Sequence, residues 1–164
     1  MSSKLNPVTV LVEFRGRVCS LSIRTTSLIV QLTRITDQSR YTLDEEFSTN
    51  DRASEGKRIG VAAMRRLIRA LEAVDGPSLY VYTSLFRLCF VDGDDYRLPT
   101  ITRCTPYYRT TESGEHIASF QIAFPTTPEL TDDNWTKWTT SDIDEAVQMI
   151  LTSIRQSAFA PGGD

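Results

Sequence analysis

The chain has 164 residues, enough for one domain or for two small repeats that share a core. Its hydrophobic content of 40% is ordinary for a globular protein and argues against wholesale disorder, and no run approaches the eighteen or so apolar residues that a membrane span needs. The net charge of −3 excludes attraction to nucleic acid through bulk charge, so any such binding requires a local basic surface.

The first part of the chain predicts four short strands joined by turns. Each run alternates apolar and polar residues with the period of two that a half-buried strand requires. The predicted strands cover residues 8–15 (VTVLVEFR), 17–24 (RVCSLSIR), 28–35 (LIVQLTRI) and 40–47 (RYTLDEEF). Their short connections predict an antiparallel meander.

A helix is predicted in the run KRIGVAAMRRLIRALEAVDG, residues 57–76. An apolar stripe recurs at helical spacing, and Asp75, Gly76 and Pro77 stop the helix. The stripe is made of Ile59, Ala63, Leu67, Leu71 and Val74. A second face carries Arg58, Arg65 and Arg69, which we interpret as a solvated face, a phosphate contact or an anchor for the acidic second half.

The same order of elements then appears again. The predicted strands are 78–84 (SLYVYTS), 86–92 (FRLCFVD), 95–104 (DYRLPTITRC) and 116–124 (HIASFQIAF), and Pro99 makes its strand an edge or a bulge. Residues 125–140 form a linker that carries both tryptophans. A final helix opens at Ser141, with Ile143, Val147, Ile150, Leu151 and Ile154 as its apolar stripe.

These elements predict an α+β fold in a single domain, residues 1–164. It consists of two repeats of four antiparallel strands plus one helix, with the helices packed between or against the sheets. The first repeat covers residues 8–75, the second residues 76–156, and residues 157–164 form a flexible tail.

Few side chains point to catalysis or metal binding. The chain has three cysteines and a single histidine, His116, so a structural zinc site would consume every nitrogen and sulfur ligand at once. No CxxC pair occurs, and the cysteines are expected to be reduced and partly buried. The DGDD run at residues 92–95 is explained by a hairpin turn, and no phosphate-cradling glycine motif is present. We therefore expect neither a metal nor a cofactor.

The passage VAAMRRLIRALEAVDGPSLYVYTS resembles the helix-to-strand passage of ribonuclease H folds. The acids which that resemblance implies would fall near Ala63 and Thr83, where this chain has none, leaving only Glu13 and Asp144. We expect the protein not to be an enzyme. A catalytically dead ribonuclease H-like domain stays open as an alternative, and a parallel strand pair with helices on both sheet faces would favour it.

Two units of four strands plus a helix resemble the Whirly and PUR-type proteins that bind single-stranded nucleic acid, over about residues 8–156. The lysine-glycine-lysine-alanine run that marks plant Whirly proteins is absent. Within this build the chain is similar to the RNA-binding proteins associated with the nucleus-like compartment of jumbo bacteriophages. That resemblance implies a viral protein, made in the bacterial cytoplasm, that binds phage messenger RNA.

The charges support such a partner in spite of the acidic total. Residues 1–110 carry 16 Lys and Arg against 12 Asp and Glu, a net charge of +4, whereas residues 111–164 carry 2 against 9, a net charge of −7. Arginines outnumber lysines by 15 to 3, and arginine makes bidentate phosphate contacts and stacks on bases. The basic part of the chain is thus the expected binding part.

A sheet with one face covered by helices leaves its other face free for bases and backbone. Single strands need cations for phosphate and aromatic rings for bases. The candidate nucleic-acid-binding residues are Arg15, Arg17, Arg24, Arg34, Tyr80, Tyr82, Arg87, Arg97, Arg103, Tyr107, Tyr108 and Arg109. Tyr80 and Tyr82 are expected opposite the apolar face of their strand, and Tyr107, Tyr108 and Arg109 in a loop.

The sequence thus predicts a non-catalytic protein that binds single-stranded RNA or DNA, RNA being favoured, with little sequence specificity. The alternative from another class is a self-assembling, structural protein-interaction module. Exposed sheet edges predict at least a homodimer. The start, MSSKLNP, has no apolar stretch after its lysine, which is not typical of a secretory signal, so we expect a cytoplasmic protein with no membrane partner.

Overall fold

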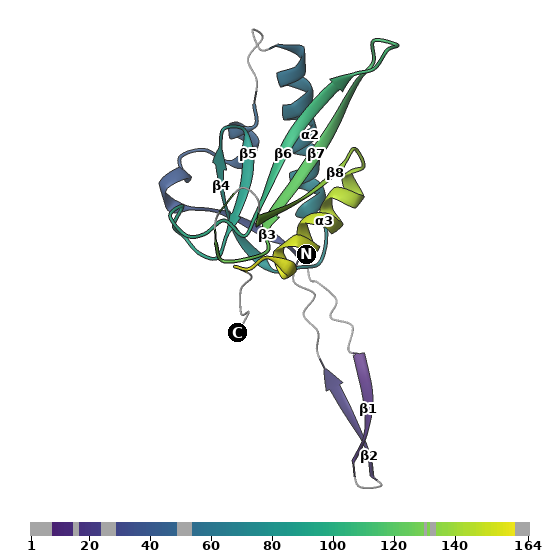
Figure 1. Ribbon diagram of the computed structural model, residues 1–164. Helices are drawn as coiled ribbons and strands as arrows, with labels where there is room; N and C mark the ends of the chain where they lie inside the picture. The colour runs from purple at the N-terminus through teal and green to yellow at the C-terminus, as the bar shows by residue number, and fades with distance from the viewer. Residues whose placement is uncertain are drawn as a thin grey trace.

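The computed structural model describes residues 8–14, 17–23, 29–48, 54–129, 131 and 134–159, and for the first two ranges it describes the backbone alone. These residues form eight strands and four helical segments (Figure 1). The strands are β1 Val8–Phe14, β2 Arg17–Ile23, β3 Gln31–Arg34, β4 Ser78–Ser84, β5 Arg87–Val91, β6 Thr102–Thr110, β7 His116–Pro125 and β8 Trp135–Thr140. The helical segments are the 3-10 turn η1 Thr36–Gln38 and the α-helices α1 Leu43–Glu46, α2 Glu55–Leu71 and α3 Ile143–Gln156.

One mixed sheet of six strands, in the order β3-β4-β5-β6-β7-β8, organises the structure. β3 and β4 are parallel, because α2 carries the chain from the end of one to the start of the other, and the remaining neighbours are antiparallel. The general α+β class is therefore confirmed. The predicted pair of four-strand repeats is wrong, since β3 from the first predicted repeat shares its sheet with all the strands of the second.

β1 and β2 form a two-stranded antiparallel sheet of their own. Its register pairs Val8 with Ile23, Val10 with Leu21 and Val12 with Cys19. Paired residues of an antiparallel ladder share a face, so the apolar positions predicted for the two strands lie on the same face of the hairpin.

The strand predicted for residues 40–47 is wrong, because this run contains helix α1. The Thr42 side chain accepts a hydrogen bond from the backbone N–H of Glu45, and the Glu45 carboxylate accepts one from the N–H of Thr42 at 2.7 Å. This reciprocal capping box stabilises a helical turn locally. The Thr-x-x-Glu spacing therefore outweighs the alternation of Tyr41 and Leu43.

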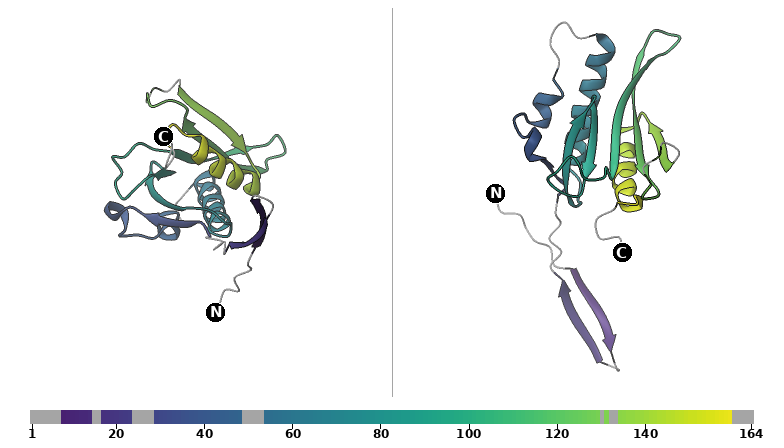
Figure 2. Two further views of the ribbon diagram at one scale, coloured as in Figure 1. Left: turned by 90° about the horizontal axis from the view of Figure 1, so that it is seen from below. Right: turned by 60° about the vertical axis from the view of Figure 1, so that its left-hand side comes forward.

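Both long helices lie on the same face of the six-stranded sheet (Figure 2). α3 bonds to β6 through the buried hydroxyls of Ser153 and Thr102, 2.9 Å apart, and α2 approaches the same face of β6 where Gly60 faces Pro106. A parallel strand pair is present, but the helices do not flank both sheet faces as a ribonuclease H-like arrangement would require. None of the described helices has the length and apolarity that crossing a membrane requires.

The core fills the space between these helices and the sheet. Met64, Leu67 and Leu71 of α2 are fully buried, as is Ile150 of α3. The apolar stripes predicted for the two helices are largely confirmed, although Ile59 and Ile143 are only half-buried. α2 ends at Leu71, before the predicted stop at residues 75–77, so half-buried Val74 lies outside the helix. The final helix begins one residue later than predicted, with Asp142 rather than Ser141 as its N-cap.

Two other segments differ from their predictions. Residues 95–101 form no strand, and β6 starts only at Thr102, since Pro99 has no N–H to donate to a ladder. The predicted linker 125–140 instead contains β8, which pairs with β7 from Phe120 to Pro125. Of the predicted tail 157–164, the described residues end at 159, and Ser157 is buried with its N–H bonded to the Ser153 carbonyl.

Candidate nucleic-acid interface

The six-stranded sheet has one face covered by helices and one open face. Alternation along β6 and β7 shows which residues lie on each face. Cys104, Phe120 and Ile122 lie on the helix side and are fully buried. The residues between them in sequence lie on the open face, where the register places Arg103, Ala123 and Lys137 side by side across β6, β7 and β8. None of the described helices packs on this part of the sheet.

We define the open-face surface by its cationic, aromatic and amide side chains on β6, β7 and β8. Its members are Arg103, Tyr107, Arg109, Gln121, Trp135 and Lys137. Arg103 and Arg109 are six residues apart on β6, which at the rise of a strand is about 20 Å. The surface is therefore long enough to contact several nucleotides of one strand.

The three strands that carry the open-face surface contain no aspartate or glutamate. Arg103, Arg109 and Lys137 therefore have no acidic neighbour on these strands, in a chain whose net charge is −3. Local positive charge of this kind can attract an anionic polymer even though the protein as a whole is acidic.

Arg103 and Trp135 are stacked across the sheet. The guanidinium carbon of Arg103 lies 4.2 Å from the centre of the Trp135 ring, within the range of a cation–π contact. Both side chains are half-buried. The contact holds the guanidinium over the indole ring, and a guanidinium group can stack on a base or bind a phosphate through two hydrogen bonds.

Tyr107 and Tyr108 lie on opposite faces of β6 rather than in the predicted loop. Tyr107 is on the open face, 46% exposed, with its hydroxyl 3.5 Å from Oε1 of Gln121. Tyr108 lies on the helix side, over Gly56 at the start of α2 and edge-to-face with His116. Only the first of these two tyrosines belongs to the open-face surface.

A different environment surrounds the part of the open face on β4 and β5. Tyr80 and Tyr82 lie on this face, opposite buried Leu79 and Val81, as their alternation predicted. Tyr82 is half-buried, and its hydroxyl is 3.0 Å from the Thr100 hydroxyl in the segment between β5 and β6. Burial raises the pKa of Tyr82 above its ordinary value.

The segment between β5 and β6 restricts access to this part of the face. Cys89 and Val91 of β5 are buried although they pair with Tyr82 and Tyr80 on the open side. Burial also raises the pKa of the Cys89 thiol. Arg87 lies on the same side at the start of β5 and is half-buried. The most accessible aromatic of β4 is Tyr80, at 37% exposed.

Two candidate arginines are already engaged by other groups. Arg34 faces the helix side, its side chain is only 9% exposed, and it donates to Gln38 at 2.9 Å and lies 3.7 Å from Glu46. Its burial removes it from any surface that contacts a long polymer. Arg97 forms a salt bridge of 2.8 Å with Asp95, and this hydrogen-bonded contact raises the pKa of Arg97 and lowers that of Asp95.

The candidates of the N-terminal hairpin lie outside the residues whose side chains the structure describes. Arg15 and Arg24 lie outside the described residues, and Arg17 is the first residue of β2, with only its backbone described. These three stay predictions. The second half of the chain therefore supplies the surface that can be described.

The arginine face of α2 contacts α1. Arg65 donates from Nε to Oδ1 of Asp44 at 2.7 Å and forms a second contact with the other carboxylate oxygen, and Arg69 approaches the same carboxylate at 3.5 Å. Arg58 is exposed near the start of the helix. The acid that these arginines contact thus comes from the first half of the chain and not from the acidic second half.

Three members of the open-face surface were not predicted as binding residues: Gln121, Trp135 and Lys137. The run WTKWTT, residues 135–140, falls in the predicted linker. Its aromatic and β-branched residues in alternation are typical of a strand and could have indicated β8. Their position beside Arg103 depends on strand order, which sequence periodicity does not give.

Comparisons of this chain with protein-family models, with curated proteins and with solved structures find no match. The resemblance to Whirly and PUR-type proteins and to jumbo-phage RNA-binding proteins therefore stays a prediction. The case for a function depends on the geometry of the open-face surface.

Proposed function

We propose that this protein binds single-stranded nucleic acid, without catalysing a reaction on it, through the open-face surface. The observation that carries the proposal is the combination of three cations and two aromatic side chains on strands that contain no acidic residue. Cations that follow the backbone and rings that stack on bases are the two components that recognition of single strands needs.

Each group has its own part in this binding. Arg109 and Lys137 are exposed and contact phosphates, and Arg103 contributes charge from its position over the Trp135 ring. Tyr107 offers a ring to a base, a contact that contributes about 1–3 kcal/mol per stacked base. Phosphate and stacking contacts carry little sequence information, so sequence preference is weak.

The same arrangement favours single strands over duplex. In a duplex the bases are stacked on one another and cannot reach Tyr107, while their phosphates can still contact the cations. A narrower form of the proposal has RNA as the preferred ligand and phage messenger RNA as the natural partner. It comes from the resemblance to jumbo-phage RNA-binding proteins.

A salt-titrated binding assay tests the proposal. Fluorescently labelled single-stranded RNA, single-stranded DNA and duplex of equal length are titrated with protein at several salt concentrations. We expect both single strands to bind better than duplex, with log K falling linearly against log salt by about 0.7 for each phosphate contacted. If neither single strand binds at low salt, the proposal is wrong and the self-assembling interaction module takes its place.

A further inference from the structure

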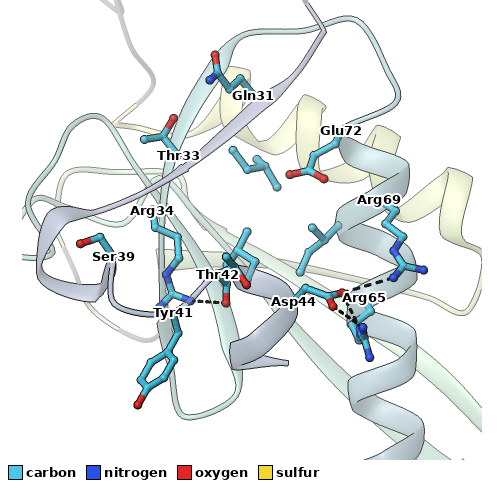
Figure 3. Close-up of a pocket in the computed structure, with 13 residues that line it drawn as sticks. Gln31, Thr33, Arg34, Ser39, Tyr41, Thr42, Asp44, Arg65, Arg69 and Glu72 are labelled. Atoms are coloured by element: carbon cyan, nitrogen blue, oxygen red, sulfur yellow. Dashed lines mark hydrogen bonds and ion pairs between the residues drawn. The ribbon is translucent and has the colours of Figure 1, made fainter. Parts of the chain in front are cut away.

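A cavity lies on the helix side of the sheet, away from the open-face surface. It has a volume of about 720 Å³ and opens between the edge strand β3, α1 and α2 (Figure 3). That size is within the roughly 300–1,000 Å³ of cavities that bind small molecules. The proposed binding of nucleic acid on the other face makes no use of it.

Three arginines line this cavity, from two elements that are far apart in sequence. Arg34 comes from β3, and Arg65 and Arg69 come from successive turns of α2. Two carboxylates, Asp44 and Glu72, also line it, and Glu46 lies 3.7 Å from Arg34 just outside the lining, so the charges around the cavity balance. An anionic ligand would therefore bind in place of Asp44, at Arg65 and Arg69.

Arg34 is unusual among these residues because it is nearly buried. Its terminal nitrogens donate to Gln38 Oε1 at 2.9 Å and to the Thr42 carbonyl at 3.4 Å, but its buried Nε has no hydrogen-bond partner among the described residues. A buried donor without a partner is costly, and this nitrogen is the one such side-chain atom in the part of the chain that the structure describes. Figure 3 shows this side chain running down the wall of the cavity.

The contacts of Asp44 show what the two helical arginines can hold. Its carboxylate is bound in a fork by Arg65, with Nε to Oδ1 at 2.7 Å, and is approached by Arg69. A pair of guanidinium groups in this arrangement also suits a phosphate, whose oxygens match the same fork. Because Asp44 is 55% exposed, solvent weakens its ion pairs, and an anion of higher charge can replace it.

The rest of the lining suits an organic group next to that anion. Leu32 and Ile68 form an apolar part of the wall, and Tyr41 presents a ring that is 48% exposed at the rim. We infer that this cavity binds a phosphate monoester, held by Arg65 and Arg69, with the attached organic group against Leu32 and Ile68. A free nucleoside monophosphate and the 5′-phosphate of a nucleic-acid strand carry the same chemistry.

Isothermal titration calorimetry with the full chain at low salt tests this inference. The probes are AMP, inorganic phosphate, adenosine, and a short oligonucleotide in two forms, one with a 5′-phosphate and one with a 5′-hydroxyl. We expect AMP to bind and adenosine not to bind. Tighter binding of AMP than of inorganic phosphate supports a contribution from the organic group. Tighter binding of the oligonucleotide with a 5′-phosphate than of the one with a 5′-hydroxyl identifies the end of a nucleic-acid strand as a source of the phosphate monoester.

Three variants separate this site from a structural ion pair. The double variant Arg65→Gln, Arg69→Gln is expected to lose about tenfold or more in phosphate affinity, since charge-assisted hydrogen bonds are lost. Asp44→Asn is expected to increase the affinity several-fold, because a competing carboxylate is removed, and a gain cannot come from unfolding. Arg66→Gln, on the same helix but outside the cavity, is the matched control and is expected to change nothing.

Two results would overturn the inference. One is that AMP, inorganic phosphate and the 5′-phosphate oligonucleotide do not bind, or that they bind equally well after Arg65 and Arg69 are replaced. The other is an affinity that stays the same or falls in Asp44→Asn while its thermal unfolding curve shows a folded protein. Neither result bears on the open-face surface, which is tested with Arg103 and Tyr107 variants.

Discussion

Arg103 on β6 and Trp135 on β8 are in contact across the strand that separates them, with the guanidinium carbon 4.2 Å from the ring centre. The contact joins a residue that sequence reasoning selected to one that it placed in a linker. It also fixes the position of a cation at the centre of the open-face surface.

The first prediction concerns this pair. Arg103→Gln is expected to weaken binding of single-stranded RNA and DNA and to flatten the dependence of log K on log salt by about 0.7, the contribution of one phosphate contact. Filter binding at four salt concentrations measures both quantities. Arg97→Gln is the matched control, because Arg97 is already paired with Asp95. An equal change of slope in both variants would contradict a specific role for Arg103.

The second prediction uses the two adjacent tyrosines. Tyr107→Ala is expected to cost about 1–3 kcal/mol of binding free energy with almost no change in salt slope, because stacking releases few counterions. Tyr108→Ala, on the opposite face of the same strand, is expected to leave binding nearly unchanged. Fluorescence anisotropy with labelled oligonucleotide gives both values. A larger loss of binding in Tyr108→Ala than in Tyr107→Ala would mean that nucleic acid binds the helix side of the sheet and not the open face.

The third prediction concerns the hydrogen bond that ties α3 to β6. Ser153 Oγ donates to the Ile150 carbonyl at 2.8 Å, so Thr102 donates to Ser153, and both hydroxyls are fully buried. Ser153→Ala leaves the Thr102 hydroxyl without a partner and is expected to lower the free energy of unfolding by about 1–3 kcal/mol. Thr102→Val keeps the Ser153 bond to Ile150 and is expected to cost less.

The double variant completes this cycle. Because it removes both hydroxyls, Thr102→Val with Ser153→Ala is expected to be less destabilised than the sum of the two single variants. Urea denaturation followed by circular dichroism measures the three free energies of unfolding. Additivity within experimental error would mean that the two hydroxyls do not interact.

The fourth prediction concerns pH. The hydrogen bonds from Arg65 hold the pKa of Asp44 below its ordinary value. A carboxyl group whose pKa is lower in the folded state stabilises that state above the ordinary pKa, and this stabilisation is lost as pH falls through the folded pKa. Carbon-13 NMR titration of the side-chain carboxyls is expected to show a low midpoint for Asp44, and a higher one in Arg65→Gln.

Asp94 is the internal control in that titration. Its pKa is also held low, through hydrogen bonds from the side chain and backbone of Thr36, and Arg65 takes no part in them. Its midpoint is therefore expected to stay the same in Arg65→Gln. An unchanged midpoint for Asp44 in that variant would show that the ion pair does not form in solution.

The fifth prediction concerns assembly. β3 and β8 are the two edges of the six-stranded sheet, and an edge strand offers unpaired backbone groups to another chain. We expect at least a homodimer, and multi-angle light scattering across micromolar concentrations measures the mass. A monomer mass at every concentration would remove this prediction without affecting the binding prediction.

The sequence by itself determined the elements whose signal is local. The stripe of Leu67 and Leu71 predicted α2, and the alternation of Leu79 and Val81 predicted which face of β4 is buried. These predictions succeed because helical and strand periods are properties of neighbouring residues. Where two local signals competed, as the capping box of Thr42 and Glu45 did with the alternation around it, alternation alone gave the wrong element.

Only the tertiary structure decided which elements meet. The parallel pairing of β3 with β4, the burial of Arg34 on the helix side and the separation of Tyr107 from Tyr108 all depend on strand order and register. The placement of Trp135 against Arg103, and of Arg65 against Asp44, joins residues from different elements. Such contacts are selected by packing of the whole chain, because periodicity places a side chain on a face but does not choose the neighbour that shares it.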